Sequence, residues 1–204
     1  MVVAGLTGGI ATGKSTVSAI FKTCGAVIVD ADVIARDVVQ KGQKAWSGIV
    51  DTFGSRILLP DGSINRPALG DIIFHDPVRQ QILNHIVHPE VMAETNRRLA
   101  EINHNSPDAV VILDVPLLFE SGMDQGLSEI IVVYIPEPLQ LQRLMHRNAL
   151  SKDQALARIR SQMPVEEKKR RATQIIDNSG ALDTTREATQ AIYQLLVSKI
   201  ERNS

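Results

Sequence analysis

The sequence GGIATGKS at residues 8–15 matches the pattern G-x-x-x-x-G-K-[ST] in full, and its surroundings give the match its meaning. An apolar run at residues 2–7 precedes it, as a buried strand would. The apolar residues that follow it have the spacing of one helix face: Val17, Ile20, Phe21 and Cys24. A strand, a glycine-rich turn and a helix N-terminus together aim backbone N–H groups and the helix dipole at an anion. An incidental Lys-Ser after a glycine-rich turn would not explain both flanks, so we predict a phosphate-binding loop (P-loop) for a nucleotide.

Each position of this loop suits a polyphosphate for its own reason. Gly8 and Gly13 allow backbone conformations and a close phosphate approach that a Cβ atom would obstruct. Lys14 is a mobile charge that can follow the β- and γ-phosphates, and the Ser15 hydroxyl is a hard oxygen ligand suited to Mg²⁺. We expect the nucleotide to contact the loop and the start of the helix: Gly8, Gly9, Ile10, Ala11, Thr12, Gly13, Lys14, Ser15 and Thr16.

Composition narrows the class of protein. With 204 residues, 44% of them hydrophobic, the chain can bury a sizeable core as one domain with an insertion. Aromatic residues make up only 3%, which argues against base-stacking surfaces and a nucleic-acid partner. Cys24, the single cysteine, is expected to be a buried apolar side chain in a reducing compartment. The apolar N-terminus runs into the P-loop rather than a cleavage site, and no segment is long enough to span a membrane, so we predict a cytoplasmic protein without a membrane partner.

Basic residues are concentrated between Arg143 and Arg171. Nine Lys and Arg against three acids give this segment a charge of +6, in a chain whose net charge is −1. A basic segment on an otherwise acidic chain suits a flap that closes over phosphates. For Lys168, Lys169, Arg170 and Arg171 a solvated helical face is the favoured interpretation.

Continuous apolar runs predict five buried parallel strands, separated by helical patterns, at residues 2–7, 26–30, 109–114, 130–135 and 174–177. This pattern predicts an α/β fold, a five-stranded doubly wound parallel sheet with its site at the carboxyl edge of the strands. We place the nucleotide-binding core at residues 1–31, 107–136 and 172–204, a helical acceptor-binding insertion at 32–106 and a helical lid at 137–171.

Turn residues divide the insertion into several helices. We expect breaks at Pro67, Pro77 and Pro89, and a loop rather than a hairpin at Pro60-Asp61-Gly62. His88-Pro89-Glu90 is typical of a helix start, which favours a capping role for His88 over a catalytic one.

Carboxylates at the strand ends are the candidates for chemistry. Asp30 and Asp32 close the second strand, and their side chains point the same way if the chain stays extended. Phosphoryl transfer to a hydroxyl needs a carboxylate that orients the nucleophile and accepts its proton, so one of the two is the candidate base, Asp32 ahead of Asp30. The alternative for Asp32 is a cap on a helix from Val33 to Val39.

Asp114 ends the third strand, where a carboxylate can reach the water shell of Mg²⁺; bonding to neighbouring backbone amides is its alternative. Arg143 and Arg147 are four residues apart, hence on one helix face, and both can approach the phosphates if that helix closes as a lid. Their planar guanidinium groups suit the charge that spreads over a transferring phosphoryl group.

Six motifs, in order over about nine-tenths of the chain, resemble the dephospho-coenzyme A kinase family. They are GLTGGIATGKS, VDAD at 29–32, His88-Pro89, DVPLLFE at 114–120, R-x-x-x-R at 143–147 and R-x-R-x-Q at 158–162. The resemblance implies a kinase of the nucleoside-monophosphate-kinase group with a core, a helical CoA-binding domain and a lid. It also implies ATP- and Mg²⁺-dependent phosphorylation of the ribose 3′-hydroxyl of dephospho-CoA, the last step of CoA synthesis.

The resemblance assigns roles to residues of this chain. Asp32 matches the family's proposed base, Lys14 and Ser15 match its phosphate and Mg²⁺ ligands, and Arg143 with Arg147 match its lid arginines. His88 gains a substrate-side role on this ground alone, beside Asp32 and Asp114. Asn178 and Gly180 fall where the family's adenine-side loop lies.

The P-loop departs from the family pattern, which usually reads GGIGSGKS. Ala11 replaces a glycine, at a cost of about 1 kcal/mol if its φ must be positive, whereas Thr12 keeps the hydroxyl of a serine.

Two other functions stay open from the residues. A kinase of the same group with another small acceptor would share the P-loop and lid, and a panel of acceptors would separate it. A regulatory nucleotide switch is disfavoured, since the chain contains neither the N-K-x-D of a GTPase nor the L-S-G-G-Q of a transporter ATPase.

Overall fold

The computed structural model describes residues 1–74 and 76–203, and the chain divides into two compact units. The first unit comprises Met1–Asp30 together with the chain from Ile102 onward, and the second comprises Ala31–Glu101. In the described residues, no helix is both long and apolar enough to cross a membrane.

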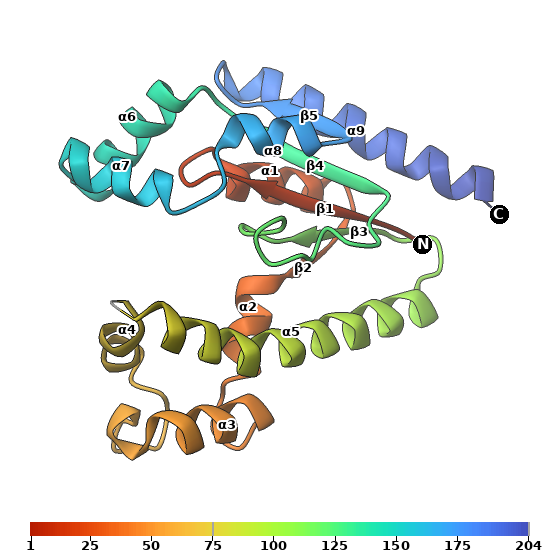
Figure 1. Cartoon of the computed structure of the whole chain (residues 1–204). Helices are drawn as coiled ribbons and strands as arrows, with labels where there is room; N and C mark the ends of the chain where they lie inside the picture. Colours follow the sequence, from red (N-terminus) through yellow and green to blue (C-terminus); the bar gives the residue numbers. More distant parts are fainter. Residues whose placement is uncertain (75, 204) are drawn as a thin grey trace. The chain divides into compact units, whose positions relative to one another are not determined.

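A five-stranded sheet forms the centre of the first unit (Figure 1). Its strands are β1 (Val2–Gly8), β2 (Val27–Asp30), β3 (Val110–Asp114), β4 (Glu129–Tyr134) and β5 (Gln174–Asp177). They run in the order β2-β3-β1-β4-β5, and every neighbouring pair is parallel. The predicted α/β sheet is confirmed, with each strand within one residue of its expected ends. Its fully buried strands, β3 and β4, are the continuous Val/Ile/Leu runs that parallel sheets require.

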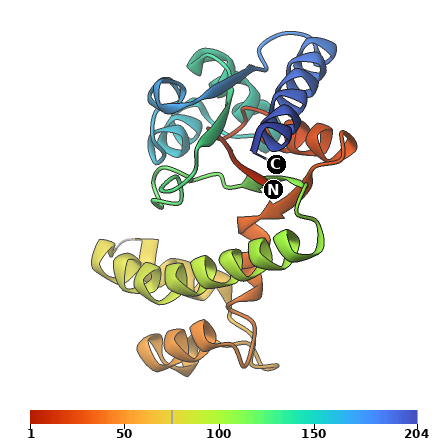
Figure 2. The same ribbon diagram turned by 90° about the vertical axis from the view of Figure 1, so that its right-hand side faces the viewer.

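Helices α1 (Lys14–Thr23) and α9 (Leu182–Asn203) cover one face of this sheet, as Figure 2 shows. Alternate side chains of β1, β3 and β4 enter a shared core with Val17 and Phe21 of α1 and Leu196 of α9. Cys24 follows α1 as its C-cap and is half-buried rather than buried, because it lies at the end of the apolar face. Burial still raises the pKa of its thiol.

The segment after β3 covers the other set of β1 side chains. A Cβ atom on Gly5 would lie 2.8 Å from Leu127 and 3.0 Å from Leu118, so this segment packs directly on the β1 backbone. Thr7 of β1 donates a hydrogen bond to the Pro116 carbonyl at 3.0 Å. Helices α6 (Glu137–Asn148), α7 (Lys152–Arg160) and α8 (Val165–Arg171) follow β4 and complete the first unit.

The second unit is helical and has its own core. It contains α2 (Ala31–Asp37), α3 (Lys44–Phe53), the 3₁₀ turn η1 (Ser55–Ile57), α4 (Arg66–Phe74) and most of α5 (Pro77–Asn105). Ile49, Phe53, Ile57 and Leu69 are buried at its centre. The expected loop at Pro60-Asp61-Gly62 is instead the turn of a minimal hairpin, because Leu58 and Ile64 form an antiparallel bridge. Gly62 has φ 82°, a value that glycine adopts without strain, and this closes the turn.

Pro89 does not start a helix, contrary to the expectation. It lies inside α5, which is 29 residues long, so His88 is in mid-helix and is no cap. Proline has no backbone N–H, so α5 lacks one helical hydrogen bond at this residue. Glu94 is paired with both Arg97 and Arg98, and Arg97 also with Glu101, along the same helix. Pro77, by contrast, is the first residue of α5, and Pro67 the second of α4, as helix starts allow.

Candidate active site

The P-loop connects β1 to α1 at the middle of the sheet, and its two framing glycines are required by geometry. Gly13 has φ 90° and is the N-cap of α1. A Cβ atom on Gly8 would lie 2.8 Å from the Val133 carbonyl oxygen, so only glycine fits beside β4. The loop thus brings the first backbone N–H groups of α1 to the carboxyl edge of the sheet, the arrangement that binds phosphate.

Ala11 adopts φ 62°, the left-handed conformation that its methyl group disfavours. Its neighbour Thr12 is fully buried and donates its hydroxyl hydrogen to the Gly9 carbonyl at 2.9 Å. The Thr12 backbone N–H bonds to the same carbonyl at 3.2 Å. The loop therefore forms a tight turn, and the sterically costly residue lies inside it.

Lys14 and Asp114 form an ion pair beside the loop. Asp114 is the last residue of β3 and only 5% exposed, so its charge is balanced by Lys14 within the protein. The sequence predicts Asp114 near Mg²⁺ or bonded to backbone amides, and it does not predict this ion pair with Lys14. Asp30 is the register partner of Asp114 on β2, which puts two carboxylates at the same edge of the sheet. Ser15 and Thr16 are exposed in the first turn of α1, where a ligand has access to their hydroxyls.

Asp32 is placed differently from the expectation. Helix α2 begins at Ala31, directly after the last residue of β2, so the chain is not extended between Asp30 and Asp32. Asp32 is then a first-turn residue of α2 and not its cap. An acidic side chain there is favoured by the helix dipole, and this one is exposed.

Asn178 lies after β5 and holds the P-loop from within the protein. Its Nδ2 donates to the Thr12 carbonyl at 2.8 Å, and its Oδ1 accepts from the Thr185 hydroxyl at 2.8 Å. The side chain is so close to the loop that a Cβ atom on Gly13 would lie 2.1 Å from Nδ2. Gly180, two residues further on, is exposed. The adenine-side role of both residues stays a prediction.

The two arginines that were predicted to belong to a lid lie on α6 and differ in their surroundings. Arg143 is half-buried, whereas Arg147 is exposed and donates from Nε to the Asn148 side-chain oxygen at 2.9 Å. Both nevertheless share one face of the helix, as their spacing predicts.

Lys168 is fully buried, so the predicted solvated face of α8 is wrong at this residue. Its ammonium group donates to the Pro116 carbonyl at 3.0 Å and pairs with Glu120 at 2.9 Å. Burial lowers the pKa of Lys168, with a smaller contribution from the nearby charge of Lys14, while Glu120 acts in the opposite direction. The motif DVPLLFE thus connects Asp114, which pairs with Lys14, to Glu120, which holds α8.

The neighbours of Lys168 are also engaged. The Lys169 ammonium lies 3.9 Å from the centre of the Tyr134 ring, and Arg171 pairs with Asp124 at 3.0 Å. A run of like charges predicts a solvated helix face, because the sequence alone does not reveal which acidic side chains and aromatic rings contact it.

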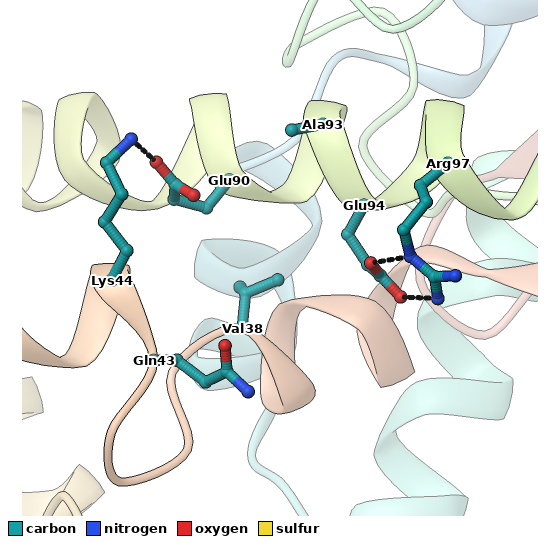
Figure 3. A pocket seen from close by; sticks show the side chains of 7 residues that line it. All are labelled: Val38, Gln43, Lys44, Glu90, Ala93, Glu94 and Arg97. Atoms are coloured by element: carbon teal, nitrogen blue, oxygen red, sulfur yellow. Dashed lines mark hydrogen bonds and ion pairs between the residues drawn. The ribbon is translucent and has the colours of Figure 1, made fainter.

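The second unit contains a shallow pocket of about 200 Å³ (Figure 3). Its charged side chains are already paired across the lining, Lys44 with Glu90 and Arg97 with Glu94. Two cations and two carboxylates leave this pocket without a net charge for an anionic ligand. His88 is exposed on α5 and does not line the pocket.

Metal binding at the P-loop would need few protein ligands. Within the described ranges, residues 1–74 and 76–203, no group of three or more His, Cys, Asp or Glu side chains could hold a metal ion. Mg²⁺ characteristically takes one or two protein oxygens together with substrate phosphates and water. The exposed Ser15 hydroxyl and the Asp114 carboxylate fit that kind of site.

An anion cradle at the end of a central parallel strand, with a lysine and a buried aspartate meeting beside it, is the arrangement of a P-loop phosphotransferase. Sequence comparison narrows the class further. A family model described as dephospho-CoA kinase matches residues 2–184, and the chain belongs to the dephospho-CoA kinase family. This family catalyses the ATP-dependent phosphorylation of dephospho-CoA, the final step of CoA biosynthesis.

Individual relatives agree over nearly the whole chain. The dephospho-CoA kinase of Carboxydothermus hydrogenoformans is 51% identical over 93% of this chain and 92% of its own length. That of Bacillus licheniformis is 47% identical over 95% and 94%. The solved structure of dephospho-CoA kinase from Campylobacter jejuni is 30% identical and superposes with a TM-score of 0.75, covering 97% of this chain and 98% of that one.

Proposed function

We propose that this enzyme transfers the γ-phosphoryl group of ATP to the 3′-hydroxyl of the ribose of dephospho-CoA, giving CoA and ADP. The observation that carries the proposal is the preformed P-loop, with Lys14 held at Asp114 on the sheet edge where β1, β2 and β3 end. Family membership supplies the acceptor, which the P-loop alone does not identify.

In the proposed mechanism the chain supplies position and charge. The P-loop amides and Lys14 hold the phosphates, and Arg143 and Arg147 of α6 add positive charge as the transferring group becomes more charged. When bound, Mg²⁺ would be held by Ser15, and by Asp114 through water, and it would offset the charge of the phosphates. Before phosphates bind, Asp114 balances Lys14, so the pair must loosen as the lysine turns to its substrate.

We assign the proton-accepting role to Asp32. It follows the last residue of β2 by two positions, it is exposed, and it matches the family's base. A general base must come within reach of the proton that it accepts, and exposure leaves the Asp32 carboxylate accessible to an acceptor hydroxyl. His88, exposed on α5, is assigned to the acceptor side, as are the other helices of the insertion at residues 32–106, and we assign Asn178 and Gly180 to the adenine side.

The proposal retains the division into a core, this insertion and a lid at 137–171. It also includes a reducing, cytoplasmic location, which the single cysteine supports, since it has no partner for an internal disulfide.

The reaction is tested by measuring ADP release from ATP and Mg²⁺ with and without dephospho-CoA. The product is checked by mass for one added phosphoryl group at the ribose 3′ position. We expect release to depend strongly on dephospho-CoA. A protein that binds ATP but is stimulated only by another acceptor from a panel would keep the P-loop chemistry and exclude this substrate.

Substitution of the two aspartates after β2 tests the base. Asp32→Asn should lower kcat by about 10²-fold or more while ATP affinity stays unchanged, which is the usual scale for a lost acid–base group. Asp30→Asn, two residues earlier at the end of β2, is the matched comparison and should retain most of the turnover. If the two variants showed the reverse pattern, the role would belong to Asp30.

A further inference from the structure

Two glutamines from the segment after β4 hold the backbone of one P-loop residue, Ile10, by both of its polar groups. Gln140 of α6 donates from Nε2 to the Ile10 carbonyl at 2.8 Å. Gln162, two residues after α7, accepts the Ile10 N–H at its Oε1, also at 2.8 Å. Each glutamine is more than 120 positions from Ile10 in the sequence, so only the fold brings them to it.

The Gln140 side chain is committed to this contact at a cost. It is only 2% exposed, and its Oε1 has no hydrogen-bond partner within the part of the chain that the structure describes. A buried carboxamide with one unsatisfied atom is destabilising by itself. The hydrogen bond from Nε2 to the loop and the packing around the side chain must therefore stabilise the folded protein enough to offset this cost.

Apolar packing reinforces the same contact. Ile10 and Ala11 pack against a cluster of Leu144, Ala155 and Ile159 from α6 and α7. Ala11, the residue that follows Ile10, is the one with φ 62°. A strained conformation persists only where its surroundings determine it, and here the hydrogen bonds to Ile10 and the apolar cluster do so.

Both side chains are neutral. A carboxamide can donate to a carbonyl or accept from an N–H without adding charge beside a polyphosphate. A lysine or glutamate at either position would change the charge that the phosphates meet.

We propose that Gln140 and Gln162 are positioning residues that fix the Ile10 backbone and so hold the P-loop in its phosphate-binding shape before nucleotide arrives. It follows that the α6–α7 pair and the P-loop form one module, with Arg143 one helical turn beyond Gln140 on the same side of α6. This inference rests on the proposed role of the loop in ATP binding, but it does not depend on which acceptor the enzyme uses.

The test replaces each glutamine by methionine, which has a similar volume but forms no comparable hydrogen bond. Affinity for ATP is measured by titration calorimetry without acceptor, so the readout is independent of the proposed reaction. Gln140→Met and Gln162→Met should each weaken ATP binding by about tenfold, the scale of one hydrogen bond. Gln142→Met, an exposed glutamine on the same helix, is the matched control and should leave binding unchanged.

The double variant separates positioning from general damage. Because both glutamines hold the backbone of the same residue, Gln140→Met/Gln162→Met should weaken binding by clearly less than the product of the two single losses. The KM for dephospho-CoA should stay within about twofold of wild type. Unchanged ATP affinity in Gln162→Met, or losses that multiply fully in the double variant, would overturn the proposal. Gln162 is half-buried, so this variant keeps the test valid if Gln140→Met fails to fold.

Discussion

At the scale of single residues, Ala11 is the position at which the unusual P-loop sequence introduces backbone strain. Its φ of 62° lies in the left-handed region that a Cβ atom disfavours, so the folded protein must offset this strain. The sequence raised the possibility of weakened affinity. Because contacts within the protein hold Ile10 and Ala11, we expect the cost to fall on folding rather than on ATP binding. A protein with glycine at this position, as in the family pattern, should therefore differ from this one chiefly in its free energy of unfolding.

Ala11→Gly should raise the free energy of unfolding by up to about 1 kcal/mol, because glycine adopts this conformation without a Cβ clash. The ATP dissociation constant should change by less than about twofold. Ala149, the αL C-cap of α6 with φ 50°, is the matched control outside the loop. Ala149→Gly should give a similar gain in chemical denaturation. Much tighter ATP binding in Ala11→Gly alone would show that the free loop relaxes away from its strained shape.

At the scale of helices and strands, the sequence predicted those elements whose burial follows a simple period. The predicted ends of the strands lie within one residue of the observed ends. This is because a parallel strand that is covered on both faces is a continuous apolar run, as at Val110–Asp114. Pro89 was wrongly predicted as a helix start, because proline is only a local signal and α5 continues through it on both sides. Lys168 was missed because its burial depends on Glu120, 48 positions earlier.

The candidate site divides in the same way. Gly8, Gly13, Lys14 and Ser15 were found because their geometry is local to one strand, loop and helix. The clamp of Gln140 and Gln162 was not predicted, because it joins three elements through side chains with many possible partners. The motif R-x-R-x-Q contained the only sequence signal for it, at Gln162.

Helix α5 gives the element-scale prediction, which concerns pH. The two hydrogen-bonded guanidinium groups of Arg97 and then Arg98 lower the pKa of Glu94 to about 2 from an ordinary value of 4.5. A lowered carboxyl pKa stabilises the folded state fully above pH 4.5, and this contribution is lost as the pH falls from 4.5 toward 2. Glu94→Gln should therefore lower the midpoint of thermal unfolding by roughly 2–5 °C at pH 7.

The difference between Glu94→Gln and wild type should shrink as the pH approaches 2. Glu101→Gln, which removes a more exposed partner of Arg97, is the control and should have a smaller effect. A difference that persisted unchanged at pH 2.5 would mean that Glu94 stabilises α5 through packing and not through its charge. Circular dichroism melts of the wild type and the two variants, each at pH 7 and at pH 2.5, are sufficient.

At the scale of the whole molecule, each of the two compact units has a buried core of its own. One core lies between the sheet and α1 with α9, and the other is built around Ile49, Phe53, Ile57 and Leu69. Each unit has the buried apolar side chains that a separate unfolding transition requires. The P-loop, Lys14 and Asp114 belong entirely to the first unit, so ATP can stabilise the second only if the two unfold together.

Native-state hydrogen exchange with and without ATP and Mg²⁺ distinguishes these cases. Ligand at about 100 times its dissociation constant stabilises the unit that binds it by about 2.7 kcal/mol, which slows exchange through unfolding about 100-fold. We expect that slowing at Ile112 and Ile131 of the sheet, and less than about threefold slowing at Ile49 and Phe53 of α3. Lys14→Ala, in which ATP is bound weakly, should abolish the difference between the two sets of amides at the same ATP concentration. Equal slowing in both cores of the wild-type protein would instead show one cooperative transition, with α5, which continues from the second unit into the first, as the element that couples them.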